Sequence, residues 1–477
     1  MSNPREPVLS EWNEVLEHAA SESRQPDDDL CLFLEHRQDL TVTARSGGST
    51  SSVHTHWSGL CAQTHEIPQI LYRSDPGFDD ASRLVDCLSE RTTTPKSRTR
   101  RETPKPTDTP KAGHRSGPHG DRGARIRSEA ESGPWVVSDL EAGRLLEELV
   151  VVMERKLPGI SVLARWIGVD QQVRIAWNGR GVATDHRSGA RLWIQARWGE
   201  AEAPASVTVE TTLHDRRTGR GELLDELSEQ ACRRLEARVD ARQARPGEYP
   251  VVFSRGVGGI LVHELVGHAL EADVVLAGTS WLSAAEKTVL PRELTVLDDP
   301  RRGRVRWRID DQGQEAKATP LLRDGRVAGC LHDRRTAERS GEEATGHGRR
   351  ASFREPVLPR MGATFVAAGR LQPPEVFEGI ARGIHVRRME AASTDTNTGR
   401  AVFRVSDADL ITHGRVDYPL HPFLLLVHGE QALATVDRIA GDLALDSCLG
   451  SCHKDGQPLA ISVGAPTFRI GLAKVMT

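Results

Sequence analysis

Two histidines and a glutamate lie close together in the apolar segment G-G-I-L-V-H-E-L-V-G-H-A-L-E-A-D, residues 258–273. Imidazole nitrogens are common ligands of divalent transition metals, and a carboxylate beside such a site can transfer a proton. His263, Glu264 and His268 therefore predict a hydrolytic metal site. The same pattern arises by chance in some sequences, and the alternative is that hydrogen bonds within a helix satisfy both histidines.

The spacing of the two histidines does not suit a regular α-helix. Residues five apart lie about 140° apart around the helix axis, whereas a spacing of four brings two side chains within about 40°. A π-type turn accommodates one extra residue and would realign the two imidazoles. Because Gly267 precedes His268 and eases a departure from α geometry, we expect a π-bulge or an early end of the helix there.

A catalytic zinc site has three protein ligands and one position open to water or substrate, so a third ligand is required. The C-terminal segment L-G-S-C-H-K-D-G-Q-P-L-A-I places Cys452 in a glycine-flanked loop before an apolar strand. A thiolate can be held rigidly there and approached closely, which makes Cys452 the candidate third ligand. The alternative for this cysteine is the role of a small buried apolar residue.

The elements that must position these residues follow from the hydrophobic pattern. Residues 246–253 have a turn and strand pattern that leads through G-V-G-G into the histidine segment, which predicts a strand, a loop and a helix in succession. From about residue 300, short alternating runs separated by D-G, H-G and N-T-G turns predict a largely β structure. We expect residues 246–477 to form a β-rich, metal-bearing C-terminal domain.

A basic segment divides the rest of the chain. Residues 91–127 hold 11 Lys/Arg against 3 Asp/Glu and almost no apolar side chains. Such a segment buries too little surface to offset the entropy of ordering, so we predict a disordered linker over residues 91–130. The alternative is a tether for nucleic acid or another anionic partner.

The regions on either side of this linker have mixed patterns. Residues 1–90 predict a small α+β region with a strand over residues 31–45. Residues 131–245 predict a second α+β portion, in which a helix over residues 140–155 precedes alternating strands of an antiparallel sheet. Leu224, Leu227, Ala231, Leu235 and Val239 recur at helical spacing and predict another helix.

The bulk composition restricts the class of protein. A chain of 477 residues is too long for one ordinary core, and a net charge of -4 gives no basic excess, so nucleic acid is not expected as the main partner. The polar N-terminus and the lack of a long apolar run predict a cytoplasmic protein without a membrane segment. Seven scattered cysteines are expected to be reduced thiols.

Taken together, the ordered motifs resemble the TldD/PmbA family of peptidases, and in particular its TldD-type metal-bearing members. The resemblance covers roughly residues 135–475. It rests on V-H-E-L-V-G-H-A-L-E-A-D followed by G-T-S, on G-S-C-H-K-D-G-Q, and on the blocks C-L-H-D-R-R-T-A-E-R-S-G, G-H-G-R-R-A-S-F-R, P-R-M-G-A-T-F-V and T-D-T-N-T-G-R-A-V-F-R between them. Ala363 departs from the family pattern, which usually has Asn there, and M-E-A-A-S-T-D replaces a glycine-rich segment.

The resemblance implies a two-domain α+β fold and a zinc ion held by His263, His268 and Cys452. It also implies hydrolysis of short or unfolded peptides and of peptide leaders, and a heterodimer with a TldE-type subunit that lacks the metal ligands. Glu264 would serve as the general base that activates water. Glu271, three residues after His268, would accept the other ring N–H of that histidine and fix its tautomer.

Two other functions compete with a zinc peptidase. One is a non-catalytic partner or binding subunit with the same fold, but this sequence retains the candidate ligands and the candidate base. The other is an electron-transfer copper site, because two histidines and a cysteine can also hold copper. Glu264 beside the histidines, and the lack of a convincing nearby methionine ligand, favour hydrolysis over copper chemistry.

Overall fold

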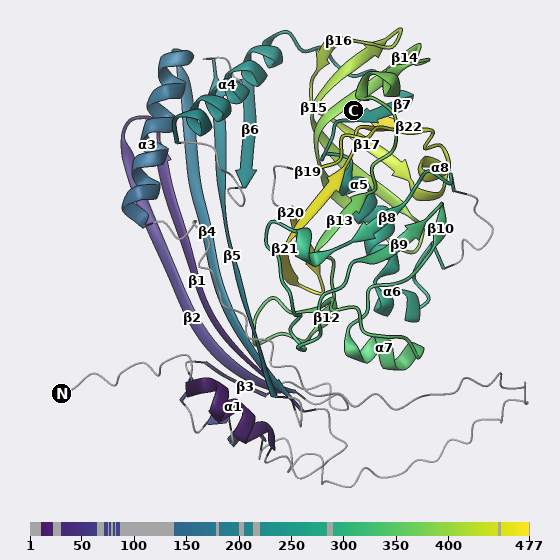
Figure 1. Cartoon of the computed structure of the whole chain (residues 1–477). Coiled ribbons are helices and arrows are strands. Elements are labelled where there is room, and N and C mark those ends of the chain that lie inside the picture. Colours follow the sequence, from purple (N-terminus) through teal and green to yellow (C-terminus); the bar gives the residue numbers. More distant parts are fainter. Residues whose placement is uncertain are drawn as a thin grey trace, which may run out of the picture.

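The computed structural model shows an α+β protein with a long antiparallel sheet beside a strand-rich C-terminal domain (Figure 1). The predicted linker, residues 91–130, lies outside the residues that the structure describes. Those are residues 11–21, 30–63, 71–74, 76–77, 80–81, 83–85, 138–177, 181–199, 205–212, 220–283, 290–446 and 450–476. The predicted fold class is confirmed. Among the described helices, none is long and apolar enough to cross a membrane.

The N-terminal sheet combines strands from both sides of the predicted linker. Its strand order is β3-β2-β1-β4-β5-β6. The central pair, β1 and β4, is antiparallel from Cys31 opposite Trp177 to Arg45 opposite Leu163. The regions 1–90 and 131–245, which the sequence analysis treated separately, therefore share one sheet. The strands are β1 (Cys31–Arg45), β2 (Ser49–Gln63), β3 (Leu71–Ser74), β4 (Ile160–Trp177), β5 (Gly181–Trp198) and β6 (Ala205–Thr212).

Helices α1 (Glu11–Ser21), α3 (Asp139–Lys156) and α4 (Arg220–Val239) pack against this sheet. Helix α3 begins at Ser138, whose side chain forms a capping box with Glu141, and it buries one apolar stripe. Helices α3 and α4 share one core with alternate residues of the strands. Helix α1 packs at the other end of the sheet, at the bottom of Figure 1. The helices predicted near residues 140–155 and 224–239 are thus present.

Within the described part of the chain, the C-terminal domain contains two seven-stranded sheets. In one, pairing of β14 with β15 closes the order β14-β7-β22-β17-β15 into a barrel, to which β16 and β18 are added. These strands are β7 (Gly247–Phe253), β14 (Arg382–Asp395), β15 (Arg400–Thr412), β16 (Arg415–Leu420), β17 (Phe423–His428), β18 (Arg438–Ile439) and β22 (Phe468–Met476). Parallel pairing of β14 with β7 brings a late segment of the domain beside the strand that precedes the histidine motif.

The second sheet carries the cysteine segment at its edge. Its order is β10-β9-β8-β13-β21-β19, and β20 pairs with β21 as a hairpin. The strands are β8 (Val296–Asp298), β9 (Thr319–Arg323), β10 (Arg326–Val327), β13 (Ala363–Val366), β19 (Ala444–Leu445), β20 (Gly450–Lys454) and β21 (Gln457–Ala465), and a small separate sheet pairs β11 (Gly348–Arg349) with β12 (Leu358–Pro359). In Figure 1 the β20–β21 hairpin lies on the side of the domain that faces the N-terminal sheet.

Short helices connect these strands. The histidine segment comprises α5 (Gly259–Val262), η1 (His263–Gly267), η2 (His268–Leu270) and α6 (Ala272–Leu276). Its apolar side chains, among them Leu261, Leu265 and Val266, are buried in the main core together with Phe403 and Phe468 of the barrel. The other short helices are η3 (Pro300–Arg302), α7 (Arg334–Ser340), η4 (Pro373–Phe377) and α8 (Gly429–Ala434).

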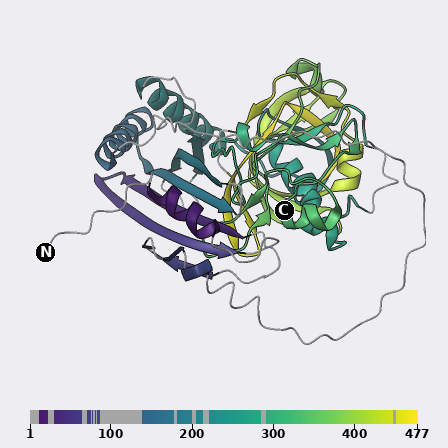
Figure 2. The same cartoon turned by 60° about the horizontal axis from the view of Figure 1, so that its bottom comes forward.

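Polar and apolar contacts join the N-terminal sheet to the C-terminal domain, and Figure 2 shows the two parts side by side. Phe33 and Cys61 of the sheet share a buried cluster with Ile309 and Phe353 of the domain. The guanidinium of Arg187 on β5 is buried and lies 2.6 Å from Asp311. These contacts position the sheet against the domain that carries the histidine motif.

Candidate metal centre

The histidine motif forms a π-turn, as its spacing predicts. After the short helix α5, residues His263–Gly267 are π-helical, and the backbone N–H of His268 donates to the carbonyl oxygen of His263. This bond spans five residues instead of four, so the turn absorbs the extra residue between the histidines. The helix then tightens into a 3₁₀ turn over His268–Leu270. The predicted π-bulge is confirmed.

Gly267 is required for a different reason from the one expected. Its backbone angles, φ −58° and ψ −59°, are ordinary right-handed helical values that any residue adopts. A Cβ atom at this position would lie 2.0 Å from Sδ of Met361. The glycine therefore provides space for a buried methionine and does not supply unusual backbone freedom.

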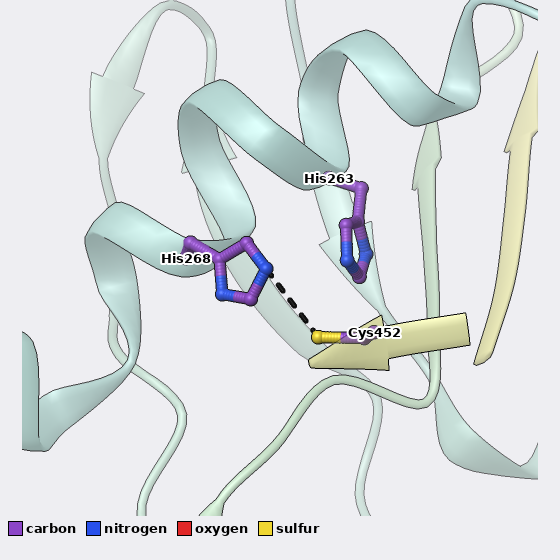
Figure 3. A group of neighbouring side chains, drawn as sticks. All are labelled: His263, His268 and Cys452. Carbon is purple, nitrogen blue, oxygen red and sulfur yellow. Dashed lines mark hydrogen bonds between the residues drawn. The ribbon is translucent and has the colours of Figure 1, made fainter. Parts of the chain in front are cut away.

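His263, His268 and Cys452 converge on one point (Figure 3). One ligand atom from each residue lies within 4.8 Å of the other two, and no other group of three His, Cys, Asp or Glu side chains within the described ranges has this geometry. Sγ of Cys452, on β20, is 3.4 Å from Nε2 of His268, and the two imidazole centroids are 4.9 Å apart. The turn and the hairpin, 184 residues apart in sequence, thus form one site.

The electrostatics of this site favour a thiolate next to positive charge. Burial disfavours the charged thiolate of Cys452. Hydrogen bonds from His263 and His268, together with the positive charges of these two imidazoles, outweigh burial and lower the pKa of Cys452 to about 5. Burial also opposes charge on His268, yet the Glu271 carboxylate and Cys452 raise the pKa of His268 well above its usual value. The site therefore stabilises a cation beside the sulfur.

The residues present fit a metal ion. Nδ1 of His263 is buried and has no hydrogen-bond partner among the described residues, which is a costly state for a polar atom unless it has another ligand. Imidazole nitrogens and thiolates both bind zinc, and three such protein ligands leave the fourth position that a catalytic zinc site keeps open. His263, His268 and Cys452 would hold such an ion.

Glu264 is fixed by a contact that the sequence analysis did not predict. The hydroxyl of Thr394, at the end of β14, donates to Oε2 of Glu264 at 2.6 Å. Thr394 lies in the family-like block T-D-T-N-T-G, but no role was assigned to it. Its place in that block was the only sign in the sequence, since the two residues are 130 positions apart.

Glu271 contacts His268, although the two do not share a helix. The 3₁₀ turn ends at Leu270, and Glu271 is extended, with φ −68° and ψ 126°. Its backbone is bridged to Leu331. Oε2 of Glu271 lies 3.0 Å from Nδ1 of His268. The bend after the turn directs the carboxylate back to the imidazole.

Three further residues near the motifs have other positions. His453 lies on the exposed side of β20 and contacts the hydroxyl of Ser451. His332 does not belong to the group of converging ligand atoms, and Cys448 lies outside the described residues. Met361 is buried against Gly267 of the turn, a contact that the sequence analysis did not predict.

Comparisons with known proteins match the part of the chain that carries this site. Residues 246–476 match the PmbA/TldA metallopeptidase C-terminal domain. A metalloprotease TldD homolog of Haemophilus influenzae is 31% identical over 249 residues, 51% of each chain. A zinc metalloprotease TldD homolog of Saccharolobus solfataricus is 26% identical over 303 residues, 62% of this chain and 66% of that protein. The chain spans about half the length of most curated relatives it matches.

Solved structures extend the likeness in fold to nearly the whole chain. The crystal structure of TldE from Thermococcus kodakarensis superposes with a TM-score of 0.73 at 14% identity, and covers 97% of this chain and 100% of that one. A proposed modulator of a DNA gyrase from Thermotoga maritima gives a TM-score of 0.72 at 13% identity, over 98% and 100% of the two chains. The solved structures show the fold, whereas the family model over residues 246–476 and the named relatives place the chain, through this C-terminal domain, in the TldD/PmbA family.

Proposed function

We propose that this chain is a zinc-dependent peptidase of the TldD type. The observation that carries the proposal is the convergence of His263, His268 and Cys452 beside Glu264. The relative from Saccharolobus solfataricus, which is named a zinc metalloprotease, supports the identity of the ion. A zinc ion held there supplies a Lewis acid that polarises a carbonyl and makes a water molecule more acidic.

The remaining chemistry belongs to residues of the chain. Glu264 follows His263 directly but is absent from the converging ligand atoms, so its carboxylate is available for proton transfer. We propose that it takes a proton from the attacking water and returns it to the leaving amine, which balances hydrolysis of a peptide bond. Thr394 orients the carboxylate by donating to Oε2. Glu271 accepts the Nδ1 proton of His268 and so leaves Nε2 directed towards Cys452.

The substrates we propose are short or unfolded peptides, including leader or modified peptides, in the cytoplasm. A strand-rich domain around the site is suited to a substrate that binds as an added β-strand, because backbone hydrogen bonds then provide affinity with little selectivity. Cleavage of varied sequences at similar rates would agree with this binding mode. Strict dependence on one substrate side chain would contradict it.

The partner we propose is a TldE-type subunit in a heterodimer. The likeness in fold to a protein named TldE supports a common architecture for the two kinds of subunit. The competing function is a non-catalytic binding subunit of such a complex. Convergence of both histidines and Cys452, with Glu264 next to His263 in the sequence, favours the catalytic role.

The test combines peptide cleavage with elemental analysis. A diverse peptide pool is incubated with the protein, alone and with a TldE-type partner, and products are identified by mass spectrometry. We expect Glu264→Gln to lower cleavage by at least about 100-fold while bound zinc is unchanged. Glu343→Gln, which changes an exposed glutamate paired with Lys317, is the matched control and is expected to cleave normally.

Two outcomes would overturn the proposal. Zinc bound by the wild type without cleavage in any combination would favour a binding subunit. Bound copper instead of zinc, with strong visible absorption from a thiolate–copper bond, would favour electron transfer.

A further inference from the structure

A buried lysine connects the two segments that form the candidate metal centre. Lys454 is the last residue of β20, and its side chain is only 11% exposed. Its ammonium lies 3.1 Å from Oε2 of Glu271 and 2.7 Å from Oδ1 of Asp273, and it donates to the carbonyl oxygen of Pro359 at 3.1 Å. A buried ammonium requires such partners, so these contacts determine where the side chain lies.

The carboxylate of Glu271 joins Lys454 to the histidine. Its Oε2 contacts both Nζ of Lys454 at 3.1 Å and Nδ1 of His268 at 3.0 Å, and the side chain is 1% exposed. Lys454 is thus a direct charged partner of the buried carboxylate that contacts the imidazole.

The position of Lys454 on its strand also links it to the cysteine. Alternate residues of a strand point to the same side, so Lys454 and Cys452 share one side of β20, and both are oriented towards the histidine segment. Cys452 contacts His268, His268 contacts Glu271, and Glu271 contacts Lys454, which lies on the same strand as Cys452.

We infer that Lys454 is a positioning residue of the metal centre, which holds Glu271 against His268 and thereby sets the direction of Nε2 and its separation from Cys452. The inference rests on the proposed zinc site and adds a role for a residue outside the proposed ligands His263, His268 and Cys452. Loss of a contact one step removed from a ligand typically weakens metal binding by about 10–100-fold.

Metal binding tests this inference without reference to peptide cleavage. The metal-free protein is titrated with Co²⁺, whose thiolate charge-transfer and visible bands report the ligands and their geometry, and then with Zn²⁺ in competition. We expect Lys454→Met to weaken affinity by about 10–100-fold and to alter the visible bands. Lys317→Met removes an exposed lysine paired with Glu343 and serves as the control, with unchanged affinity expected.

The substitution Lys454→Met in a Glu271→Gln protein tests whether Lys454 acts through Glu271 or only stabilises the strand. If Lys454 acts through the carboxylate, Lys454→Met should cost less than about 2-fold in a Glu271→Gln protein, because effects within one network are not additive. The double variant has no buried carboxylate left without a partner. If Lys454→Met alone does not fold, the double variant and Glu271→Gln can still be compared. A further tenfold loss in that background would overturn the inference.

Asp273→Asn provides the remaining comparison. This substitution removes the charge of the 2.7 Å ion pair between Lys454 and Asp273 but keeps the ion pair between Lys454 and Glu271. We therefore expect a metal affinity within about 3-fold of the wild type. A loss as large as that of Lys454→Met would show that the lysine merely braces the strand, and would overturn the inference. If the wild type binds neither metal, the proposed zinc site itself fails; if it binds and Lys454→Met binds equally well, only the role of Lys454 fails.

Discussion

At the residue scale, the candidate base depends on one hydroxyl from a distant strand. A charge-assisted hydrogen bond such as that from Thr394 to Glu264 is stronger than a neutral one and restricts the carboxylate to one orientation. Hydrogen bonds to charged groups contribute about 1.5–3 kcal/mol. Thr394 is therefore expected to affect proton transfer more than metal binding.

We predict that Thr394→Val lowers kcat for peptide cleavage by about 10-fold or more while zinc content is unchanged. Valine keeps the shape of the side chain and removes only the donor. Steady-state kinetics across pH and elemental analysis provide the measurement. Thr412→Val removes a similar hydroxyl–carboxylate contact, to Asp417 at an exposed position, and is expected to have no effect on kcat. Equal losses in both variants would contradict the role of Thr394.

Residue types and spacing predicted most of the candidate centre but not its supports. His263, Glu264 and His268 lie within six positions, so the local pattern shows them together. Thr394 reaches Glu264 only because β14 and its hairpin lie beside the turn, and Lys454 reaches Glu271 only because β20 faces it. Such contacts depend on tertiary arrangement, which a single sequence does not specify.

At the scale of elements, the π-turn and the packing beneath it determine where the imidazoles point. The turn follows from the count of residues between the histidines, so the sequence was sufficient to predict it. The close approach of Met361 to Gly267 was not predictable, because it depends on how the segment before β13 crosses the turn. This close approach leaves no space for a side chain larger than hydrogen at residue 267.

We predict that Gly267→Ala destabilises the protein by about 1–3 kcal/mol, the usual cost of overpacking a core, and weakens zinc binding. The added methyl group would overlap Met361, so the turn or the methionine must move. Urea unfolding and zinc titration provide the measurements. Gly221→Ala, in α4 where a Cβ meets no atom within 4 Å, is the control and should be neutral or slightly stabilising.

Combining Gly267→Ala with Met361→Ala tests the cause of that loss. If overlap with the methionine is responsible, the double variant should be more stable than the sum of the two single effects predicts, because the alanine methyl partly fills the space. Strict additivity would place the effect of residue 267 elsewhere in the turn.

The length of strand β4 could not be predicted from the hydrophobic pattern. Alternation predicted strands after the helix over residues 140–155 but did not show their length, and the first of them, β4, extends over Ile160–Trp177. Polar residues at the centre of β4, such as Asp170 and Gln171, interrupt the pattern, but pairing with β1 and β5 on both sides continues through them. Long-range pairing thus extends a strand that its own residues would end.

At the scale of the whole molecule, buried charges join the N-terminal sheet to the domain that carries the candidate centre. Neither the shared sheet of residues 31–74 and 160–212 nor this junction follows from sequence patterns, because both join segments separated by more than 80 residues. Arg187 contacts Asp185 on its own strand and Asp311 and the Ile309 carbonyl across the junction. Asp311 also accepts from Arg349.

We predict that Arg187→Met destabilises the protein by about 3–5 kcal/mol, because it leaves buried carboxylates without their main partner. Asp311 is 1% exposed, so water cannot replace the lost contact. Arg404→Met is the matched control, since the Arg404–Glu390 pair is 62% and 65% exposed, and it should change stability by less than about 1 kcal/mol. Urea unfolding followed by tryptophan fluorescence measures both.

The pH dependence of that difference identifies the charge responsible. Burial tends to raise the pKa of Asp311, but Arg187, Arg349 and Arg350 outweigh it and hold the pKa below its ordinary value of 3.8. A carboxylate whose pKa is lower in the folded state stabilises that state above its unfolded pKa, and the contribution disappears as pH falls through the folded pKa. Arg187→Met should therefore cost most near pH 7, and the difference from the wild type should narrow below about pH 4 as Asp311 takes up a proton. A difference that stays constant from about pH 7 to pH 3 would show that the lost packing of the arginine side chain, and not its charge, holds the sheet against the metal-bearing domain.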